Sequence, residues 1–107
     1  MSKGSGLLLV AADIDSENEV DFNRWYDEEH IAERLSIPGF VRARRFTALE
    51  GGPKYLALYD LTSPDALQSD LYKSLTGEGR NAWTLKIQKQ MKNYMRNVYV
   101  CTSDRTK

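Results

Sequence analysis

Two short apolar runs constrain the fold of this sequence most. Residues 7–12 (LLLVAA) and 55–59 (YLALY) are each long enough for a β-strand, yet neither alternates between apolar and polar residues. A strand with one face in water alternates, whereas a strand that is covered on both faces does not. Both runs therefore predict a sheet that needs cover on its two faces. They are too short for a transmembrane helix, which needs about 20 apolar residues.

Capping and turn residues divide the rest of the chain into further elements. Ser16 and Glu19 have the spacing of a capping box at a helix start, and Pro38 ends that helix. Ser63-Pro64-Asp65 opens a second helical region with a capping hydroxyl, a proline in the first turn and an acidic residue. In chain order, the predicted elements are a strand (about 7–14), a helix (about 16–35), two strands of a hairpin (40–49 and 55–61), a helical region (63–92, interrupted at 76–79) and a strand (97–102).

The order β-α-β-β-α-β predicts an α+β protein with the ferredoxin-like arrangement, a four-stranded antiparallel sheet with helices on one face. At 107 residues the chain has the length of a single domain, with 1–6 and 103–107 as loose tails. Helices cover one face of the sheet, and a second copy of the sheet is the simplest cover for the other. We therefore expect a homodimer that associates through the sheet face.

The net charge of zero results from two oppositely charged segments. Residues 13–33 hold nine acidic residues and one arginine, whereas residues 80–107 hold seven basic residues and one acidic residue. Both segments belong to helical regions that are expected on the same face of the sheet, so we predict that they lie close together. The neutral total argues against a nucleic-acid partner, which would favour a basic surplus.

No membrane segment or targeting signal is expected. The first apolar run is followed by acidic residues rather than by a cleavage site with small residues. The single cysteine, Cys101, cannot form an internal disulfide and favours a reducing compartment. The sequence therefore predicts a cytoplasmic protein without a membrane partner.

The first predicted helix holds the best candidates for chemistry. Phe22, Tyr26 and His30 are spaced four residues apart and share one row, and Trp25 and Glu29 form the adjacent row. Histidine is the only side chain that titrates near neutral pH without a perturbed pKa, so His30 is the acid/base candidate, with Tyr26 or Glu29 as its partner. The same stripe also suits the core face of a helix, in which the histidine would only donate to a backbone carbonyl.

Two further candidates lie on the predicted strands. Arg45 could hold an anion near a pocket, or it could be a charge that discourages pairing at a sheet edge. Tyr59 could anchor a substrate oxygen. One histidine and one cysteine far apart in the sequence leave too few ligands for zinc, and no acidic loop has calcium spacing. We expect neither a metal nor a cofactor.

Three segments resemble the EthD-like branch of the dimeric α+β barrel superfamily. They are FNRWYDEEH (22–30), Pro38-Gly39-Phe40 with Arg42 and Arg44-Arg45, and KYLALY (54–59). The likeness extends over about residues 7–101. It implies a ferredoxin-like protomer whose sheet pairs with that of a second copy to form a barrel. It also implies a cleft between helices and sheet, with His30 at the position of the family's helix histidine.

The resemblance also implies a range of activities. The superfamily includes cofactor-free monooxygenases, lactone isomerases, polyketide cyclases and haem-handling enzymes, which share a small apolar cleft with a few polar groups. Haem-degrading relatives use an Asn-Trp-His arrangement. Asn23, Trp25 and His30 are present here but are crowded on one helix, which departs from that pattern.

Three functions follow as hypotheses. The first is a small cofactor-free enzyme of the isomerase, cyclase or monooxygenase type that acts on a small aromatic or polyketide-like carbonyl compound. The second is a non-catalytic ligand-binding or accessory protein of an oxygenase system. The third is a structural dimer whose cleft is filled by aromatic side chains, which a cavity bordered by His30 would exclude. In the enzyme, the expected catalytic residues are His30 and Tyr26, and the expected ligand-binding residues are Phe22, Trp25, Glu29, Arg45 and Tyr59.

Overall fold

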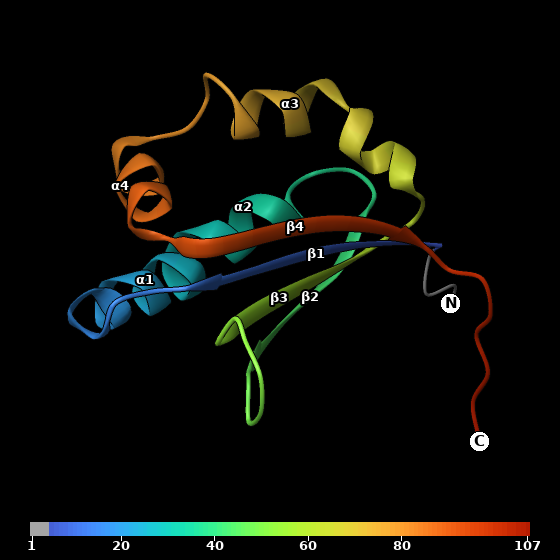
Figure 1. Ribbon diagram of the computed structural model, residues 1–107. Coiled ribbons are helices and arrows are strands. Elements are labelled where there is room, and N and C mark those ends of the chain that lie inside the picture. Colours follow the sequence, from blue (N-terminus) through green and yellow to red (C-terminus); the bar gives the residue numbers. More distant parts are fainter. Residues whose placement is uncertain (1–4) are drawn as a thin grey trace.

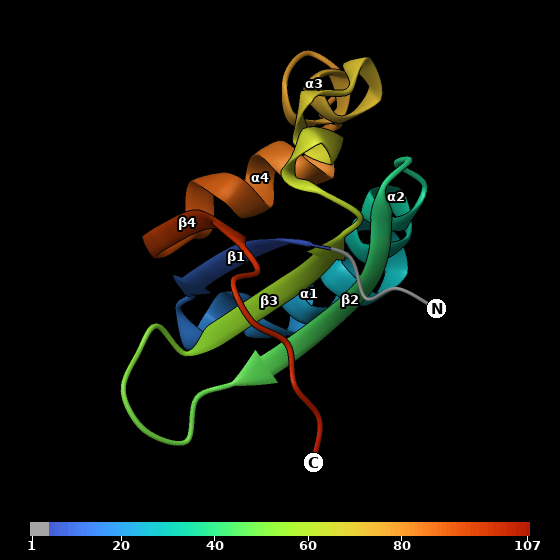
Figure 2. The same cartoon turned by 90° about the vertical axis from the view of Figure 1, so that its right-hand side faces the viewer.

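Four antiparallel strands form one sheet, in the order β2-β3-β1-β4, in the computed structural model, which describes residues 5–107 (Figure 1). The strands are β1 (Gly6–Asp13), β2 (Phe40–Thr47), β3 (Tyr55–Leu61) and β4 (Lys92–Val100). The α-helices are α1 (Glu19–Trp25), α2 (Ile31–Leu35), α3 (Asp70–Thr76) and α4 (Ala82–Gln90). They lie on one side of the sheet (Figure 2), which confirms the predicted ferredoxin-like α+β fold.

The strand register assigns each side chain to one of the two sheet faces. Leu8 of β1 lies opposite Tyr59 of β3, and both are buried beneath the helices. Their neighbours Leu9 and Leu58 also lie opposite each other and point to the other face, where no helix among the described residues covers them. We call this second face the outer face. Its apolar side chains are Leu7, Leu9, Phe46, Leu56, Leu58, Met95 and Tyr99.

The predicted capping box at the first helix is wrong. A 3-10 turn at Ser16–Asn18 precedes α1, and no side chain caps either helical segment. The Glu19 carboxylate accepts hydrogen bonds from the Lys54 ammonium, at 2.7 Å, and from the Tyr55 hydroxyl. Because Tyr55 of β3 and Lys54 just before it engage Glu19, the Glu19 side chain ties the helix to the sheet instead of returning to its own backbone.

The second helical region is divided more finely than expected. The predicted cap at Ser63 is confirmed, since its hydroxyl accepts a hydrogen bond from the Asp65 N–H at 3.1 Å. The 3-10 segment that follows, Pro64–Gln68, ends before Ser69, which caps α3 by accepting from the Tyr72 N–H. A separate cap by Asn81 begins α4.

The last strand begins at Lys92 and ends at Val100, instead of covering 97–102. The predicted helix up to residue 92 ends at Gln90, because the following residues belong to β4. Pairing of β4 with β1 extends from Gly6 and Val100 to Asp13 and Lys92, so the backbone groups of β1 find partners along almost its whole length. This tertiary pairing overrides the local helical pattern.

The expected loose tails are partly included in the sheet. Gly6 is the first residue of β1, the Ser5 N–H donates to the Thr62 carbonyl, and the Cys101 N–H donates to the Ser5 carbonyl. The rest of the expected N-terminal tail, residues 1–4, lies outside the described residues. Residues 101–107 have no helix or strand and are exposed.

The two charged segments lie close together, as predicted. Lys86 of α4 pairs with Asp21 of α1 at 2.8 Å, and Lys92 of β4 pairs with Asp15 at 2.9 Å. The side chains of these pairs are partly exposed, so they orient the C-terminal elements over α1 more than they stabilise the fold. No helix in residues 5–107 is long and apolar enough to cross a membrane.

Candidate functional site

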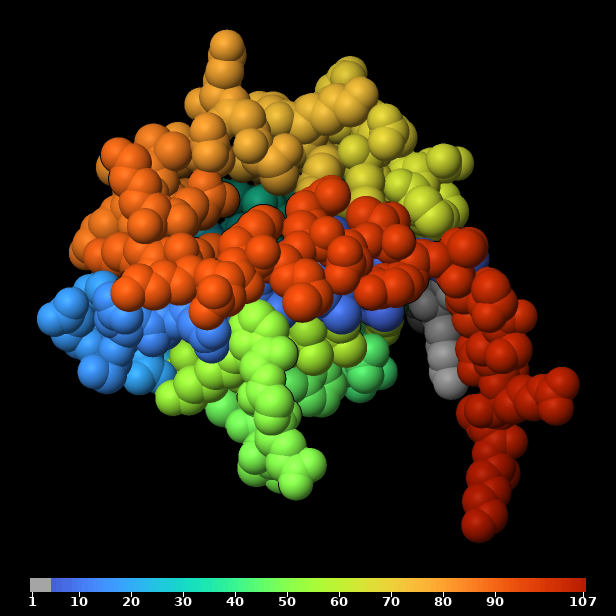
Figure 3. Space-filling model, in the orientation of Figure 1, coloured from blue at the N-terminus to red at the C-terminus, as the bar shows by residue number. Residues whose placement is uncertain are grey.

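A cavity of about 310 Å³ lies between the helices and the inner face of the sheet. In Figure 3 the surface is hollowed between β4 and the segment of α3 and α4, and teal atoms from the α2 region are visible at the bottom of the hollow. The cavity is lined by Leu8, Val10, Trp25, Tyr26, His30, Arg34, Tyr59, Tyr72, Thr76, Gln88, Met91, Tyr94 and Arg96. Because His30 borders an open cavity, the hypothesis of a filled cleft is excluded.

A π-helical turn, Tyr26–His30, positions the candidate histidine. The sequence predicts one regular α-helix here, but the Ile31 N–H donates to the Tyr26 carbonyl five residues earlier. The wider turn places residues five apart on one row, so His30 stacks on Trp25 with ring centroids 4.0 Å apart and an interplanar angle of 21°. The expectation that Trp25 shares its row with Glu29 is therefore wrong. Such turns are rare and occur frequently at functional sites.

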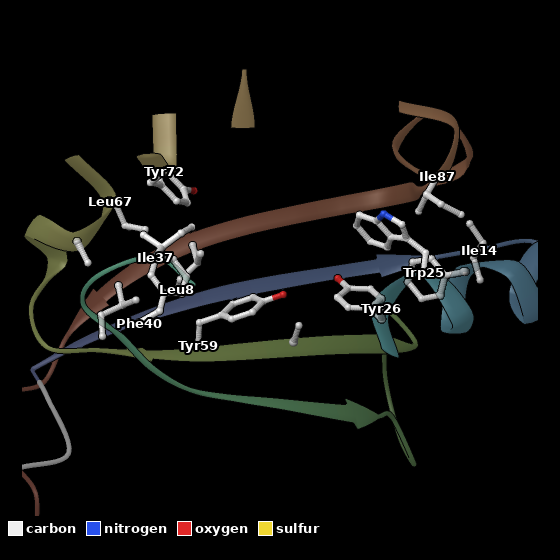
Figure 4. Close-up of a cluster of buried hydrophobic side chains, with 14 residues drawn as sticks. Leu8, Ile14, Trp25, Tyr26, Ile37, Phe40, Tyr59, Leu67, Tyr72 and Ile87 are labelled. Carbon is white, nitrogen blue, oxygen red and sulfur yellow. The ribbon is translucent and has the colours of Figure 1, made fainter. Parts of the chain in front are cut away.

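Two lining side chains each present a buried polar atom without a hydrogen-bond partner. They are His30, which is 7% exposed, through its Nδ1, and Tyr59, which is 1% exposed, through its hydroxyl. Figure 4 shows the hydroxyl groups of Tyr26 and Tyr59 directed toward each other. Buried polar groups in native proteins nearly always have partners, so unpartnered atoms beside a cavity indicate a place for water or a ligand.

Burial keeps these groups uncharged. Removal from water, together with the positive charges of Arg34 and Arg45, lowers the pKa of His30 to about 2. Burial raises the pKa of Tyr26 to about 12, partly opposed by Arg45, and it also raises the pKa of Tyr59. Burial and the two arginines therefore place the pKa of His30 below the neutral range of an unperturbed histidine. At pH 7 the cavity offers a neutral imidazole and two neutral phenol groups as hydrogen-bonding partners.

Two arginines that are not among the predicted site residues also line the cavity. Arg34 of α2 is 5% exposed, and its Nη1 donates to the Glu33 carboxylate at 2.9 Å. Arg96 of β4 donates from its Nη2 to the Tyr72 hydroxyl at 2.9 Å. The spacing of four residues between His30 and Arg34 could have indicated that Arg34 lies on the same side of the helix as His30. Nothing in the local pattern distinguishes Arg96 from the other basic residues of the C-terminal segment.

Phe22 and Arg45 lie behind the lining instead of in it. The Phe22 ring packs edge-on against Tyr26 at 5.1 Å, and the Arg45 guanidinium lies 4.2 Å from the Tyr26 ring centroid. Arg45 also donates to the Asn23 side-chain oxygen at 2.8 Å. Both residues therefore hold Tyr26 in place. Because Asn23 is bound to Arg45 outside the cavity, the Asn-Trp-His arrangement of haem-degrading relatives is not assembled.

Glu29 also lies outside the cavity. Its carboxylate accepts from the Asn81 side-chain amide at 2.7 Å and from the Thr84 hydroxyl at 3.4 Å. The Thr84 hydroxyl in turn accepts from the Trp25 indole N–H at 3.0 Å, and Figure 4 shows the indole nitrogen directed toward α4. Glu29 thus holds the start of α4 over Trp25.

Of the seven predicted site residues, the structure brings together His30, Tyr26, Trp25 and Tyr59 around the cavity. No group of three or more His, Cys, Asp or Glu residues that could hold a metal ion occurs among residues 5–107. The cavity is therefore a site of aromatic rings, neutral hydroxyl and imidazole groups, and two guanidinium groups.

Comparisons with known proteins reveal similarity in structure. No family model and no curated protein matches the sequence significantly. A dimeric ferredoxin-like protein from an uncultured marine organism is 20% identical, with 97% of this chain and 93% of that chain covered and a TM-score of 0.73. The cofactor-independent oxygenase SnoaB from Streptomyces nogalater is 16% identical, with 94% and 95% covered and a TM-score of 0.64. The haem degrader MhuD from Mycobacterium tuberculosis is 14% identical, with 94% and 99% covered and a TM-score of 0.62. At these identities the similarity establishes the shared fold.

Proposed function

We propose that this protein is a cofactor-free enzyme of the isomerase, cyclase or monooxygenase type that acts on a small aromatic or polyketide-like carbonyl compound. The observation that carries the proposal is the aromatic cavity in which His30 Nδ1 and the Tyr59 hydroxyl are buried without partners. The fold shared with the cofactor-independent oxygenase SnoaB supports the monooxygenase type. The Trp-Tyr and Glu-His pairs of 25–30 and the Pro-Gly-Phe of 38–40 support membership of the EthD-like branch.

Removal of a proton next to a carbonyl group is the first step that the three reaction types share. The neutral His30 imidazole accepts a proton from a substrate C–H or O–H, while Tyr26 and Tyr59 donate to the carbonyl oxygen. The resulting enolate is stabilised by the hydroxyl groups and by the nearby guanidinium groups. It then gains a proton at another carbon, or adds to a second carbonyl of the same molecule, whose oxygen takes the proton from His30. With O₂ as the oxidant, a carbon that still carries a hydrogen instead forms a C–OOH group, which takes the proton from His30 and loses water to leave a new carbonyl.

The charge of the enolate also assists the base. The pKa of about 2 describes His30 in an empty cavity, where burial and two arginines disfavour the imidazolium. An enolate beside it supplies the opposite charge and raises the pKa of His30. The proton and the negative charge therefore form as a pair, and neither is stable in the cavity alone.

The burial of His30 between the rings of Trp25 and Tyr26 favours the second hypothesis, a ligand-binding or accessory protein. An imidazole with so low a pKa is a weak base toward any ligand that does not develop negative charge. In a ligand-binding or accessory protein, the same cavity binds a small aromatic ligand without converting it.

We propose that the protein acts as a homodimer through the outer face. Leu9 and Leu58 lie opposite each other at its centre, and the marine protein with the same fold is described as dimeric. We further propose that residues 1–107 form one domain. The free, exposed Cys101 supports a reducing compartment, the cytoplasm.

A combined binding and turnover experiment tests the proposed function. Small aromatic carbonyl compounds and phenols are screened by thermal shift, since a bound ligand raises Tm. Each hit is incubated with the protein in air and followed by mass spectrometry. We expect conversion of at least one hit, and His30→Gln should lower its rate about 100-fold or more. The matched control, Glu28→Gln on the exposed side of the same π turn, should leave the rate unchanged.

The outcomes separate the hypotheses. Hits that bind but are recovered unchanged support the accessory protein. Equal conversion by wild type and His30→Gln would remove His30 from the mechanism. The absence of any hit from a broad aromatic panel would overturn the assignment of the cavity as a ligand site.

A further inference from the structure

The charged groups around the cavity have one sign. The lining includes Arg34 and Arg96, and none of the described lining residues is a carboxylate. The neighbouring Glu33 is the counterion of Arg34, and its carboxylate engages one guanidinium nitrogen, Nη1. Arg96 forms no ion pair with any residue in the described part of the chain. The cavity therefore has an uncompensated positive charge at its rim.

The two guanidinium groups are fixed on one side of the cavity through a shared neighbour. Arg34 lies over the ring of Tyr72, 5.8 Å from its centroid, and Arg96 donates to the hydroxyl of the same residue at 2.9 Å. These contacts come from three separate elements, α2, α3 and β4. The guanidinium positions are thus set by tertiary structure and do not depend on one flexible segment.

The effect of Arg34 reaches the other polar groups of the cavity. After burial, which is the largest cause, its charge contributes to lowering the pKa of His30 and opposes the raised pKa values of Tyr26 and Tyr59. Arg34 is buried and already pairs with Glu33, whereas Arg96 is exposed and has no acidic partner among the described residues. The positive charge of the lining therefore favours an anionic ligand over a neutral or cationic one, with Arg96 as the available cation.

We propose that the cavity selects ligands in which an aromatic ring carries an anionic oxygen, a carboxylate or an acidic enol, and that Arg96 and Arg34 recognise that oxygen. The inference rests on the proposed function, because it names the substrate class of the same cavity. The ring packs among the aromatic lining near Trp25 and Tyr59 while the anion faces the arginines. Arg96 retains donors beyond the one used on Tyr72, and guanidinium groups bind carboxylates through paired hydrogen bonds.

The experiment compares ligands that differ only in charge. Binding of benzoate, 2-naphthoate and anthracene-2-carboxylate is measured by calorimetry at pH 7 beside the corresponding neutral carboxamides. At least one acid is expected to bind about 10-fold or more tightly than its amide, the value of a charge-assisted hydrogen bond. The preference should decrease as the salt concentration rises.

Substitutions then locate the selectivity. Arg96→Gln, at an exposed strand position, should remove most of the preference and leave the affinity for the amide unchanged. Arg34→Gln, with its fold checked by circular dichroism, should act in the same direction. Arg24→Gln is the matched control, because this exposed arginine pairs with Glu28 and neither residue lines the cavity.

Every outcome bears on the proposal. If no acid binds more tightly than its amide, selection for an anion is wrong, although binding of the amides would leave the proposed function standing. If both arginine variants keep the full preference, the assignment of Arg34 and Arg96 is wrong. If no acid or amide binds at all, the inference fails together with the proposed ligand site, and the broad screen of neutral carbonyl compounds shows whether the proposed function fails as well.

Discussion

The two faces of the sheet differ in what their side chains can do, although they belong to the same strands. Leu8 and Leu9 are consecutive in β1, yet Leu8 borders a cavity with hydroxyl, imidazole and guanidinium groups, whereas Leu9 lies opposite Leu58 on the outer face. The inner face encloses a cavity that a better-packed core would fill, and a cavity lowers the stability of the protein. The outer face encloses nothing and exposes apolar area. This difference supports the two proposals that the inner face admits a small ligand and that the outer face meets another flat apolar surface.

Strand β4 belongs to both environments. Arg96 points to the cavity, while its neighbours Met95 and Asn97 point to the outer face. An edge strand with apolar side chains is a liability when it is exposed. Association through the outer face would therefore restrain the strand that carries one of the two cavity arginines.

The largest expected effect tests the outer face. Leu9→Glu together with Leu58→Glu places two carboxylates at the centre of the proposed dimer interface, and burial of unpaired charge should weaken association about 1000-fold or more. Sedimentation equilibrium measures the change. As a control, Val20→Glu on the exposed side of α1, at a residue that is 75% exposed, should leave the association constant unchanged. A double variant that remains a dimer would contradict the proposed interface.

A matched pair of truncations tests the contrast between adjacent residues. Leu8→Ala removes a side chain that is only 2% exposed and should lower the free energy of unfolding by about 3 kcal/mol. Leu9→Ala should cost less in the isolated protomer and act mainly on association. Urea unfolding measures both losses in backgrounds with a weakened dimer interface. Leu8→Ala is made in the double glutamate variant, and Leu9→Ala is made in the Leu58→Glu variant, because Leu9 is already replaced in the double variant. Equal losses would mean that the two faces do not differ in packing.

The pH dependence of stability tests the environment of His30. Its pKa is about 2 in the folded protein and near 6.5 when unfolded, so below pH 6.5 the unfolded chain binds a proton that the folded protein does not. Stability should therefore decrease as the pH falls, by about 2 kcal/mol between pH 7.5 and pH 5. His30→Gln should abolish this loss, and Glu28→Gln should retain it. A wild-type protein with no loss over this interval would show that His30 is not held neutral by burial.

The smallest expected effect concerns the two kinds of buried tyrosine. The Tyr59 hydroxyl has no partner, so Tyr59→Phe should leave the ligand-free protein equally stable or about 1 kcal/mol more stable, while ligand binding weakens. Tyr72→Phe instead removes the hydroxyl that Arg96 binds and should be destabilising. Thermal unfolding with and without a ligand measures both variants. Destabilisation by Tyr59→Phe would indicate that its hydroxyl is engaged in the empty protein.

The sequence predicted what depends on local pattern. The element order, the hairpin, the Ser63 cap and the facing charged segments follow from turn residues, apolar runs and charge, and the structure confirms them. Four of the seven site residues also reach the cavity, because His30, Tyr26 and Trp25 share one helix and Tyr59 follows the alternation of its strand.

What escaped prediction depends on contacts between distant elements. Glu19 has the spacing of a capping residue, but its carboxylate binds Lys54 and Tyr55. Strand β4 begins earlier than predicted because β1 pairs with it. The sequence offers Arg45 as a residue that could hold an anion, but in the structure its guanidinium contacts Tyr26 and Asn23. Arg96 could not be assigned, since its role follows from the strand pairing that directs it toward Tyr72.

The π turn offers a criterion for comparing sequences across the fold. Trp25 and His30 stack because five positions separate them and the turn between them is one residue longer than an α-helical turn. We expect a related chain with a spacing of four to have an ordinary α-helix there, with its histidine and the later residues of that helix turned relative to the tryptophan. This spacing should then separate relatives that share the stacked pair from those that share only the fold.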